Sequence, residues 1–422
     1  MSPAKFVQIH TLTSYPASLL NRDDAGFAKR LPFGGVTRTR VSSQCLKYHW
    51  RHHEGQYALR ELEKPQSVRS RHTFGQLLAQ PLVEQGYPSA LVTCVVRSLM
   101  EIVLSGKRLP DSEFSKLLKS DDEPESMLRT PQVTVLGDPE IRYLKSVAVH
   151  ALDQLHEDLS DSWDTSGPDF TKNQTKHVIE ICKSFSESEM KRNLHGLGLA
   201  AGIDAALFGR MATSDLLAIG DAAIHVSHSF TTHEEEAESD YFSAVDELVQ
   251  AMGDGAQGSG HINTSELMSG LFYGYVVVDV PLLVSNLEGC PRSQWEQADR
   301  ALAADVVERL IHIIATVSPG AKLGSTAPYA RSECVLIEAG TSQPRTLANA
   351  FRTPVSKTPD LLCNTYQSLA QYVEQMDFMY SSEDLRCISA MDATERLLEA
   401  TKLDGVLPLA ETASWAATQV RG

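Results

Sequence analysis

Alternating apolar and polar positions predict four strands in this chain. In the first, Val7, Ile9 and Thr11 recur at every second position, so one of its faces is expected to be buried. The β-rich run FYGYVVVDV predicts the third. The expected strands are Lys5–Ser14, Ile224–Thr232, Gly270–Pro281 and Cys334–Glu338.

Helical spacing of apolar residues predicts helices between these strands. Ser42 or Ser43 is a suitable N-cap for a helix that runs to about His53. Leu46 and Trp50 lie on the apolar stripe of this helix. The other expected helices are several within residues 56–190, then Lys191–Gly209, Ser293–Val317 and Asn364–Met376.

Without its insertions, the chain has the order strand, helix, strand, strand, helix, strand. This order is typical of ferredoxin-like and RNA-recognition folds. Between the two central strands lie residues 232–269, which are 38 residues where a hairpin needs about two to five. This insertion contains an acidic run and the flexible stretch GDGAQGSG. We expect it to be functional, and the alternative is a disordered loop.

The composition excludes several classes of protein. The 422-residue chain has a net charge of −16, so it is not a uniformly basic nucleic-acid binder. Its seven cysteines are scattered without a CxxC pair, which argues against a disulfide framework and a thiolate zinc site. No apolar stretch reaches the ~18 residues of a membrane span, and the N-terminus lacks the pattern of a signal peptide. We therefore expect a cytoplasmic protein.

The charges are distributed unevenly along the chain. Residues 22–71 contain eleven Lys and Arg against five Asp and Glu, so this window is net positive within an acidic protein. Residues 234–254 contain eight acids and no Lys or Arg. A basic segment of this kind can follow a phosphate backbone while the acidic remainder discourages loose binding elsewhere. Chance clustering of surface charge is the alternative.

Residues 21–51, NRDDAGFAKRLPFGGVTRTRVSSQCLKYHWR, gather cations around an expected helix start. After a Gly-Gly turn, Arg38 and Arg40 alternate, so both point to one side if the chain is extended. The following helix start offers free N–H groups and the positive end of the helix dipole, which suit a phosphate. One face of this helix carries Gln44, Lys47, Tyr48 and Arg51. The pattern favours a polyanion over a small ligand.

Seven matching segments occur along the chain in a fixed order. The first is the N-terminal signature NRDD, then FGG followed by R-x-R, then SSQ-x-LK. The others are GRMATSD at 209–215, SFTTH at 229–233, YFSAVDEL at 241–248, SGLFYGY at 269–275, SPGAK at 318–322 and LANAF at 347–351. Together they resemble CasC, the repeated backbone subunit of the type I-E CRISPR complex Cascade. The resemblance covers about residues 5–52 and 195–352.

The resemblance implies an α+β protein that is organised like a right hand. The palm is a modified RNA-recognition (ferredoxin-like) fold, the fingers are a helical insertion, and the thumb is a long β-hairpin. The implied divisions are palm at 1–59, 191–233 and 269–422, fingers at 60–190, and thumb at 234–268.

The resemblance also implies a function in antiviral defence. Such a subunit is non-catalytic, polymerises along the CRISPR guide RNA (crRNA) and presents it in kinked segments for pairing with target DNA. The implied partners are crRNA, the target DNA strand through the guide, and further copies of the chain arranged head to tail. The other implied partners are the Cascade subunits, namely the guide 5′ end cap subunit, the large and small subunits, and the repeat-processing endoribonuclease. Beyond the guide RNA, no cofactor or metal is implied, and no membrane partner.

Individual residues follow from the same resemblance. The implied RNA contacts are Arg22, Lys29, Arg38, Arg40, Ser43, Gln44, Lys47, Arg51, Arg210 and Lys322. The residues implied to lie at the kinked base, or in the thumb beside it, are Met211, Tyr241, Phe242 and Val245. The sequence leaves open whether Lys29 or Arg30 contacts RNA. Apolar and aromatic side chains stack on bases of any identity, which suits a subunit that must accept any guide.

Other chemistry is less well supported by the sequence. Asp23 and Asp24 suggest metal-assisted RNA cleavage, so a metal-dependent endoribonuclease of the same fold is the alternative function. A structural role in the loop is favoured for this pair. HGLGLAAG at 195–202 lacks both a preceding strand and the GxGxxG spacing, so it indicates a closely packed helix. The three histidines of the first helix have no carboxylate at a ligand spacing, and no zinc site is expected.

Overall fold

The computed structural model describes residues 3–119, 124–159, 170–197, 199–210, 216–217, 220–245, 259–382, 384–392 and 394–422. The chain divides into two compact units. The first comprises Met1–Glu61, Ile224–Pro281 and Asp299–Gly422, and the second comprises Leu62–Ala223 and Leu282–Ala298. The second unit therefore extends past the boundary expected at residue 190.

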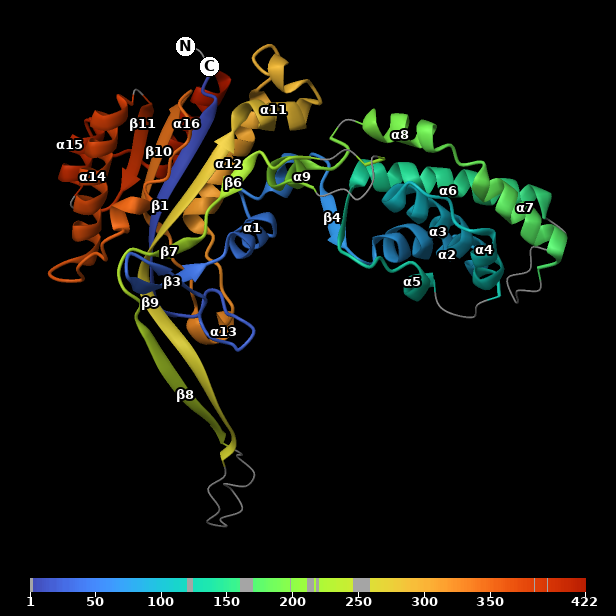
Figure 1. Cartoon of the computed structure of the whole chain (residues 1–422), viewed down its shortest axis with the longest axis horizontal. Helices are drawn as coiled ribbons and strands as arrows, with labels where there is room; N and C mark the ends of the chain where they lie inside the picture. Colours follow the sequence, from blue (N-terminus) through green and yellow to red (C-terminus); the bar gives the residue numbers. More distant parts are fainter. Residues whose placement is uncertain are drawn as a thin grey trace. The chain divides into compact units, whose positions relative to one another are not determined.

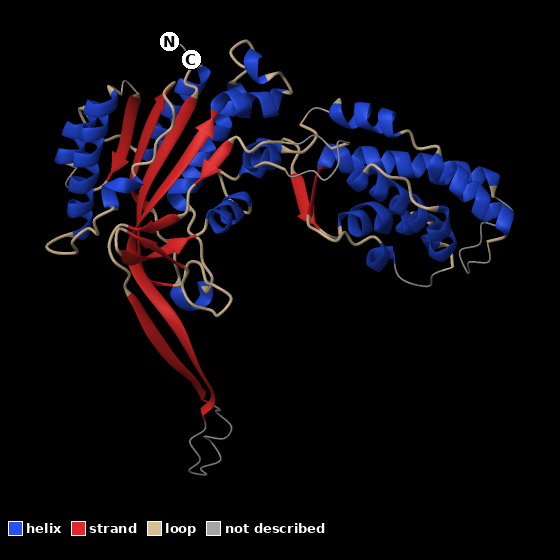
Figure 2. Ribbon diagram, in the orientation of Figure 1, coloured by secondary structure: helices blue, strands red, loops and turns tan. Residues whose placement is uncertain are grey.

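A nine-stranded antiparallel sheet is the centre of the first unit as described (Figure 2). Its strands are β1 (Phe6–Ser18), β2 (Arg30–Phe33), β3 (Val36–Val41), β6 (Ile224–Val226), β7 (Ser229–Thr231), β8 (Ala237–Val245), β9 (Ser259–Asp279), β10 (Ser332–Gly340) and β11 (Leu385–Ala390). The order across the sheet is β11-β10-β1-β9-β7-β3-β2, and β6 and β8 also pair with β9. β1 is central, since Ile9 lies opposite both Ile337 of β10 and Val276 of β9.

The topology of the sheet follows the order expected from the sequence. β9 lies between β1 and β7, and β1 lies between β10 and β9, so each strand–helix–strand unit has another strand inserted between its own two. This is the split arrangement of a ferredoxin-like fold. The expected α+β class is confirmed.

Helices cover both faces of this sheet (Figure 1). One face packs against α1 (Ser43–Arg51), α12 (Ala301–Thr316) and α16 (Leu409–Arg421). The other packs against η5 (Ala348–Phe351), α14 (Leu361–Tyr380) and α15 (Glu395–Thr401), where Leu12, Tyr273 and Leu336 of the sheet meet Tyr366 and Leu369 of α14. An open aromatic sheet face of the kind that RNA-recognition domains use is therefore not present among the described residues.

Two expected helices have different bounds in the structure. The helix expected at Ser293–Val317 begins at Ala301, because the Asp299 carboxylate accepts the Ala301 N–H at 2.9 Å and η4 (Arg292–Gln294) forms a separate turn. The single helix expected at Lys191–Gly209 is wrong. The helix is interrupted between α8, which ends at His195, and α9, which begins at Ile203. Gly202 lies in this interruption with φ +80°, and a Cβ there would lie 2.4 Å from the Gln66 carbonyl carbon.

The second unit is mainly helical. Its elements are β4 (Ser67–Ser70), η2 (Phe74–Ala79), α2 (Gln80–Glu84), α3 (Ser89–Ser105), α4 (Asp111–Leu117), α5 (Pro124–Met127), β5 (Thr134–Gly137), α6 (Asp138–Asp158), α7 (Lys172–Lys183), α8 (Glu187–His195) and α9 (Ile203–Phe208). The chain enters this unit through η1 (Leu59–Leu62), and α11 (Val280–Glu288) follows β9. Its core lies between α3 and α6, where Leu99 and Leu152 are both fully buried.

β8 and the first part of β9 form a ladder beyond the sheet, which we call the thumb hairpin. The ladder runs from the pair Ala237–Met268 to the pair Val245–Ser259. Residues 246–258, which include most of GDGAQGSG, lie outside the described residues. The base of the thumb hairpin is acidic, and its carboxylates pair with cations of the same chain. Lys357 contacts Glu236, and Arg30 contacts both Glu235 and Glu266.

Candidate nucleic-acid interface

The loop that follows β1 is folded by its own polar side chains. Asn21 Oδ1 accepts the Ser42 N–H at 2.9 Å, which joins this loop to the start of α1. Asp23 Oδ1 accepts the N–H groups of Ala25 and Phe27, each at 2.9 Å. The carboxylate of Asp23 therefore closes the turn, while Arg22 bridges to Ala28 through its backbone and has an exposed side chain.

Lys29 and Arg30 have different roles in the first unit. The Arg30 guanidinium contacts Glu235 and Glu266, and Glu266 Oε2 also accepts the Ala28 N–H at 2.7 Å. Arg30 thus connects β2 to the base of the thumb hairpin. Lys29 is half-buried, and among the described residues its ammonium group forms no ion pair. Of these two cations, Lys29 is the one available to a ligand.

The glycine pair of the FGG motif turns β2 into β3. Gly34 and Gly35 have φ of +65° and +83°, the left-handed region that favours glycine. A Cβ on Gly34 would also lie 1.6 Å from the Arg352 carbonyl oxygen. The motif is therefore required by the turn and by its close contact with the segment that follows η5.

The two arginines of β3 are not equivalent. Arg38 is 0% exposed, and its guanidinium donates to the carbonyl oxygens of Phe33, Thr231 and Phe351 at 2.9–3.3 Å. Burial lowers the pKa of Arg38, and the charge of Glu234 opposes this shift. The expected RNA contact of Arg38 is therefore wrong, because β7 and η5 enclose the side chain.

Replacing Arg38 by Met is expected to lower the free energy of unfolding by about 2 kcal/mol, because three buried carbonyl groups lose their donor. Chemical denaturation followed by circular dichroism measures this change. Arg40, which is half-buried, provides the control. The Arg40→Met variant is expected to lower the free energy of unfolding by less than about 1 kcal/mol. Equal losses in the two variants would contradict the structural role of Arg38.

Arg40 lies at the edge of the sheet beside a histidine. Its Nε donates to the Arg30 carbonyl oxygen at 3.0 Å, and its Nη1 donates to His228 Nδ1 at 3.0 Å. Burial and then the charges of Arg40 and Lys29 lower the pKa of His228. The imidazole is therefore neutral at neutral pH with its proton on Nε2. The cations Lys29 and Arg40 thus lie close enough to His228 to disfavour its protonated form, in addition to the effect of burial.

α1 presents its polar side away from the sheet. The Ser42 hydroxyl accepts the Cys45 N–H at 3.3 Å, which confirms a serine N-cap at the start of this helix. Trp50 is buried on the inner side, Lys47 and Arg51 are half-buried, and Gln44 is exposed. Ser43 opens the helix next to the Asn21 loop.

A small hydrophobic cluster holds the expected contact residues together. Its buried members are Tyr15, Leu19, Leu20, Ala28, Val41, Met268 and Phe272, and Leu46 and Ala321 pack against it. The Ala321 N–H also donates to the Leu19 carbonyl at 2.9 Å. Four expected cations directly follow or precede members of this cluster, namely Lys29, Arg40, Lys47 and Lys322. Lys322 stands at the start of α13 (Leu323–Thr326).

We call this surface the basic face. It comprises Arg22, Lys29, Arg40, Ser43, Gln44, Lys47, Arg51 and Lys322. The loop after β1, strand β3, helix α1 and the segment before α13 supply these residues, and each of these segments contributes a residue to the hydrophobic cluster. Eight of the ten residues that the resemblance implied as RNA contacts therefore lie on segments that share this cluster.

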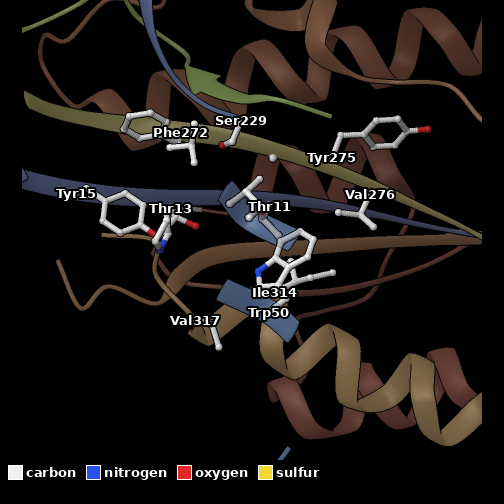
Figure 3. Close-up of a pocket in the computed structure, with 14 residues that line it drawn as sticks. Thr11, Thr13, Tyr15, Trp50, Ser229, Phe272, Tyr275, Val276, Ile314 and Val317 are labelled. Atoms are coloured by element: carbon white, nitrogen blue, oxygen red, sulfur yellow. The ribbon is translucent and has the colours of Figure 1, made fainter. Parts of the chain in front are cut away.

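A cavity lies on the inner side of α1, between the helix and the sheet (Figure 3). Trp50 borders it together with Thr11, Thr13 and Ser229, and its volume is about 40 Å³. Gly274 also lines the cavity, and a Cβ there would lie 2.5 Å from Thr11 Oγ1, so this position has no room for a side chain. Such a volume holds a few water molecules and is far below the roughly 300 Å³ of a ligand pocket. The cavity is therefore too small for a nucleotide.

Arg210 lies in the second unit, where its side chain is buried. It is 3% exposed, and its Nη1 contacts both oxygens of the buried Glu140 at 2.6 and 2.8 Å. Glu140 Oε2 also accepts the Gly137 N–H at the start of α6. The buried ion pair is inconsistent with the RNA contact expected of Arg210.

The residues expected at the kinked base are only partly covered by the structure. Met211 lies outside the described residues. Tyr241, Phe242 and Val245 lie on β8, where their backbones pair with Thr264, Asn263 and Ser259, and their side chains lie outside what is described.

Sequence reasoning missed His228 and the role of Arg30. His228 had a signal, because it continues the alternation of Ile224 and Val226 toward one face. No sequence signal indicated the pairing of Arg30 with Glu235 and Glu266, since more than 200 residues separate the partners. Over the described part of the chain, no three His, Cys, Asp or Glu side chains converge as metal ligands, and no described helix is long and apolar enough to cross a bilayer.

Residues 7–415 match the protein family described as CT1975-like protein, and the chain belongs to this family. A solved structure titled "CRISPR RNA-guided surveillance complex, pre-nicking" is 24% identical with a TM-score of 0.74, and the match covers 98% of this chain and 100% of that one. Another, titled "CRISPR RNA-guided surveillance complex", is 22% identical with a TM-score of 0.64, with 98% and 99% covered. A comparison with curated proteins found no match. The resemblance to CasC is confirmed at the level of the family and the fold.

Proposed function

We propose that this chain is a non-catalytic, RNA-binding backbone subunit of a CRISPR RNA-guided surveillance complex. The observation that carries the proposal is the basic face, where the loop after β1, strand β3 and the segment before α13 bring cations next to α1 within an acidic protein. Family membership and the titles of the similar structures support the assignment to such a complex.

The chemistry of the basic face suits an RNA backbone of any sequence. Arg22, Lys29 and Arg40 can hold phosphates, and the first N–H groups of α1 add a positive dipole end. Positioning of this kind carries no base information, so specificity is left to pairing between guide and target. The proposed ligand is therefore the crRNA, and the target DNA strand is reached through it.

Assembly along the guide requires repeated copies of the chain. The thumb hairpin extends the sheet beyond the basic face through a single long strand, β9, and is suited to contact a neighbouring copy. Its basal carboxylates are already paired with Arg30 and Lys357 of the same chain. Contact with the next copy is therefore assigned to the outer part of the hairpin, with the cap, large and small subunits and the processing endoribonuclease as further partners of the complex.

Phosphate-driven binding predicts a specific salt dependence. If one protomer neutralises roughly 4–5 phosphates of a single strand, the logarithm of its affinity falls with the logarithm of salt concentration at a slope near −3. Fluorescence anisotropy with two unrelated single-stranded RNAs, over roughly 50 to 200 mM salt, measures this slope. Equal slopes and nearly equal affinities are expected. A flat salt dependence or a strong preference for one sequence contradicts the proposal.

A metal-dependent endoribonuclease is the alternative. In the structure, the Asp23 carboxylate closes a turn by accepting two backbone N–H groups, and Asp24 is exposed beside it. Incubating the same RNAs with and without Mg²⁺ separates the two functions. Magnesium-dependent cleavage by the unchanged chain, lost in Asp24→Ala, would favour the enzyme and overturn the non-catalytic proposal.

A further inference from the structure

Tyr48 and Trp50 of α1 lie on different sides of the helix. Trp50 points inward and lines the cavity against the sheet (Figure 3). Tyr48 points outward and is 57% exposed, although a phenol ring of this size gains stability from burial. Gln44 and Tyr48 are the exposed residues of the helix, and the exposed His52 caps it four residues further on. These three side chains form a ridge along the outer side of α1.

The outward ring is part of an ordered pair. The centroids of the Tyr48 and His52 rings are 4.3 Å apart, with an angle of 34° between their planes. His52 Nδ1 lies 2.8 Å from the Tyr48 carbonyl oxygen, so it carries a proton and donates to that oxygen. This bond fixes the imidazole over one side of the phenol. His49 meets the same phenol edge-on, with centroids 5.4 Å apart.

The ring pair lies on the basic face, next to cations that are assigned to RNA phosphates. Lys47 precedes Tyr48 and Arg51 follows one turn later, and both belong to the surface assigned to phosphates. A strand held there by its phosphates can place an unpaired base against the ridge. An exposed aromatic ring between cations stacks on a base of any identity. A ring pair restrained by neighbours loses little conformational freedom when it does so.

We propose that the Tyr48–His52 ring pair is a stacking platform for one unpaired nucleobase of bound single-stranded RNA. This inference rests on the proposed function, because the RNA is placed on the basic face by its phosphates. It adds a base contact to a surface otherwise built for the backbone. The contact raises affinity without selecting a sequence.

The test compares ligands with and without bases. Tyr48→Ala is expected to weaken binding of a single-stranded RNA of mixed sequence about tenfold. Its affinity for inorganic polyphosphate of similar length is expected to be unchanged, since polyphosphate has no base to stack. Tyr48→Phe retains the ring and is expected to keep most of the RNA affinity, whereas Tyr48→Leu is expected to behave like Tyr48→Ala. The slope of RNA affinity against salt stays the same in all three variants.

A matched control is available on another part of the first unit. Tyr380 is 63% exposed at the end of α14, which covers the other face of the sheet. Tyr380→Ala is expected to bind both ligands as the unchanged chain does. If the unchanged chain binds RNA and Tyr48→Ala binds it equally well, the platform is wrong while the proposed function stands. Equal loss of RNA and polyphosphate binding would also overturn the platform, because it indicates damage to α1. If the unchanged chain binds no RNA, the proposed function fails and the platform with it.

Discussion

Simultaneous replacement of Arg22, Lys29 and Arg40 by alanine is expected to weaken RNA binding on the order of 100-fold near physiological salt. Each cation is assigned one or more phosphate contacts, and each lost contact removes about 0.7 from the salt slope. The slope is therefore expected to fall from near −3 to near −1. The same anisotropy titrations that establish the slope of the unchanged chain measure both effects.

The control for this variant removes the same charge elsewhere. Lys116 and Lys176 of the second unit and Arg396 of α15 are exposed cations in surface ion pairs, and none of them belongs to the basic face. Their triple alanine replacement changes the net charge by the same amount and is expected to change RNA affinity less than about threefold. A comparable loss in both triple variants would show that binding follows net charge, and the basic face would then have no special role.

Replacement of Glu140 by Gln is expected to lower the free energy of unfolding by about 4 kcal/mol. Both side chains of the Glu140–Arg210 pair are 1% exposed, so removing one charge leaves the other buried without its counter-ion. Glu140 Oε2 also accepts the Gly137 N–H, and the variant weakens this bond at the start of α6. Urea denaturation followed by the helical signal of circular dichroism measures the loss.

Two further variants make this second prediction specific. Glu101 forms a partly exposed pair with Arg97 on α3, and Glu101→Gln is expected to cost less than about 0.5 kcal/mol. Replacing both members of the buried pair, Glu140→Leu with Arg210→Met, is expected to recover part of the stability because no unpaired charge remains. A Glu140→Gln variant as stable as Glu101→Gln would show that the buried pair does not support the second unit.

Local patterns were sufficient to predict much of the first unit. The alternation around Ile9 predicted β1, and the run from Tyr273 to Val278 predicted the central strand β9. The serine N-cap and apolar stripe predicted α1, which ends within two residues of the expected position. Neighbouring residues are sufficient to predict these features, because the side-chain periods of strands and helices depend only on local geometry. The order of the elements then predicted the split topology of the sheet.

Long-range packing decided which of the predicted cations can meet a ligand. Arg38 and Arg40 have the same local pattern, but β7 and η5 enclose the first and leave the second at the edge. Arg30 is committed to carboxylates at the base of the thumb hairpin, which leaves Lys29 for the basic face.

Long-range packing also decided two features of the second unit that sequence motifs had suggested differently. The glycines near residue 200 suggested a continuous helix, but the helix is interrupted where the Gly202 backbone approaches Gln66. Arg210 lies in a motif read as an RNA contact, and its charge is instead neutralised by Glu140 in the interior. The sequence by itself determined the elements and the basic composition of the site. The tertiary structure decided which charges are buried, because burial depends on segments that lie far apart in the chain.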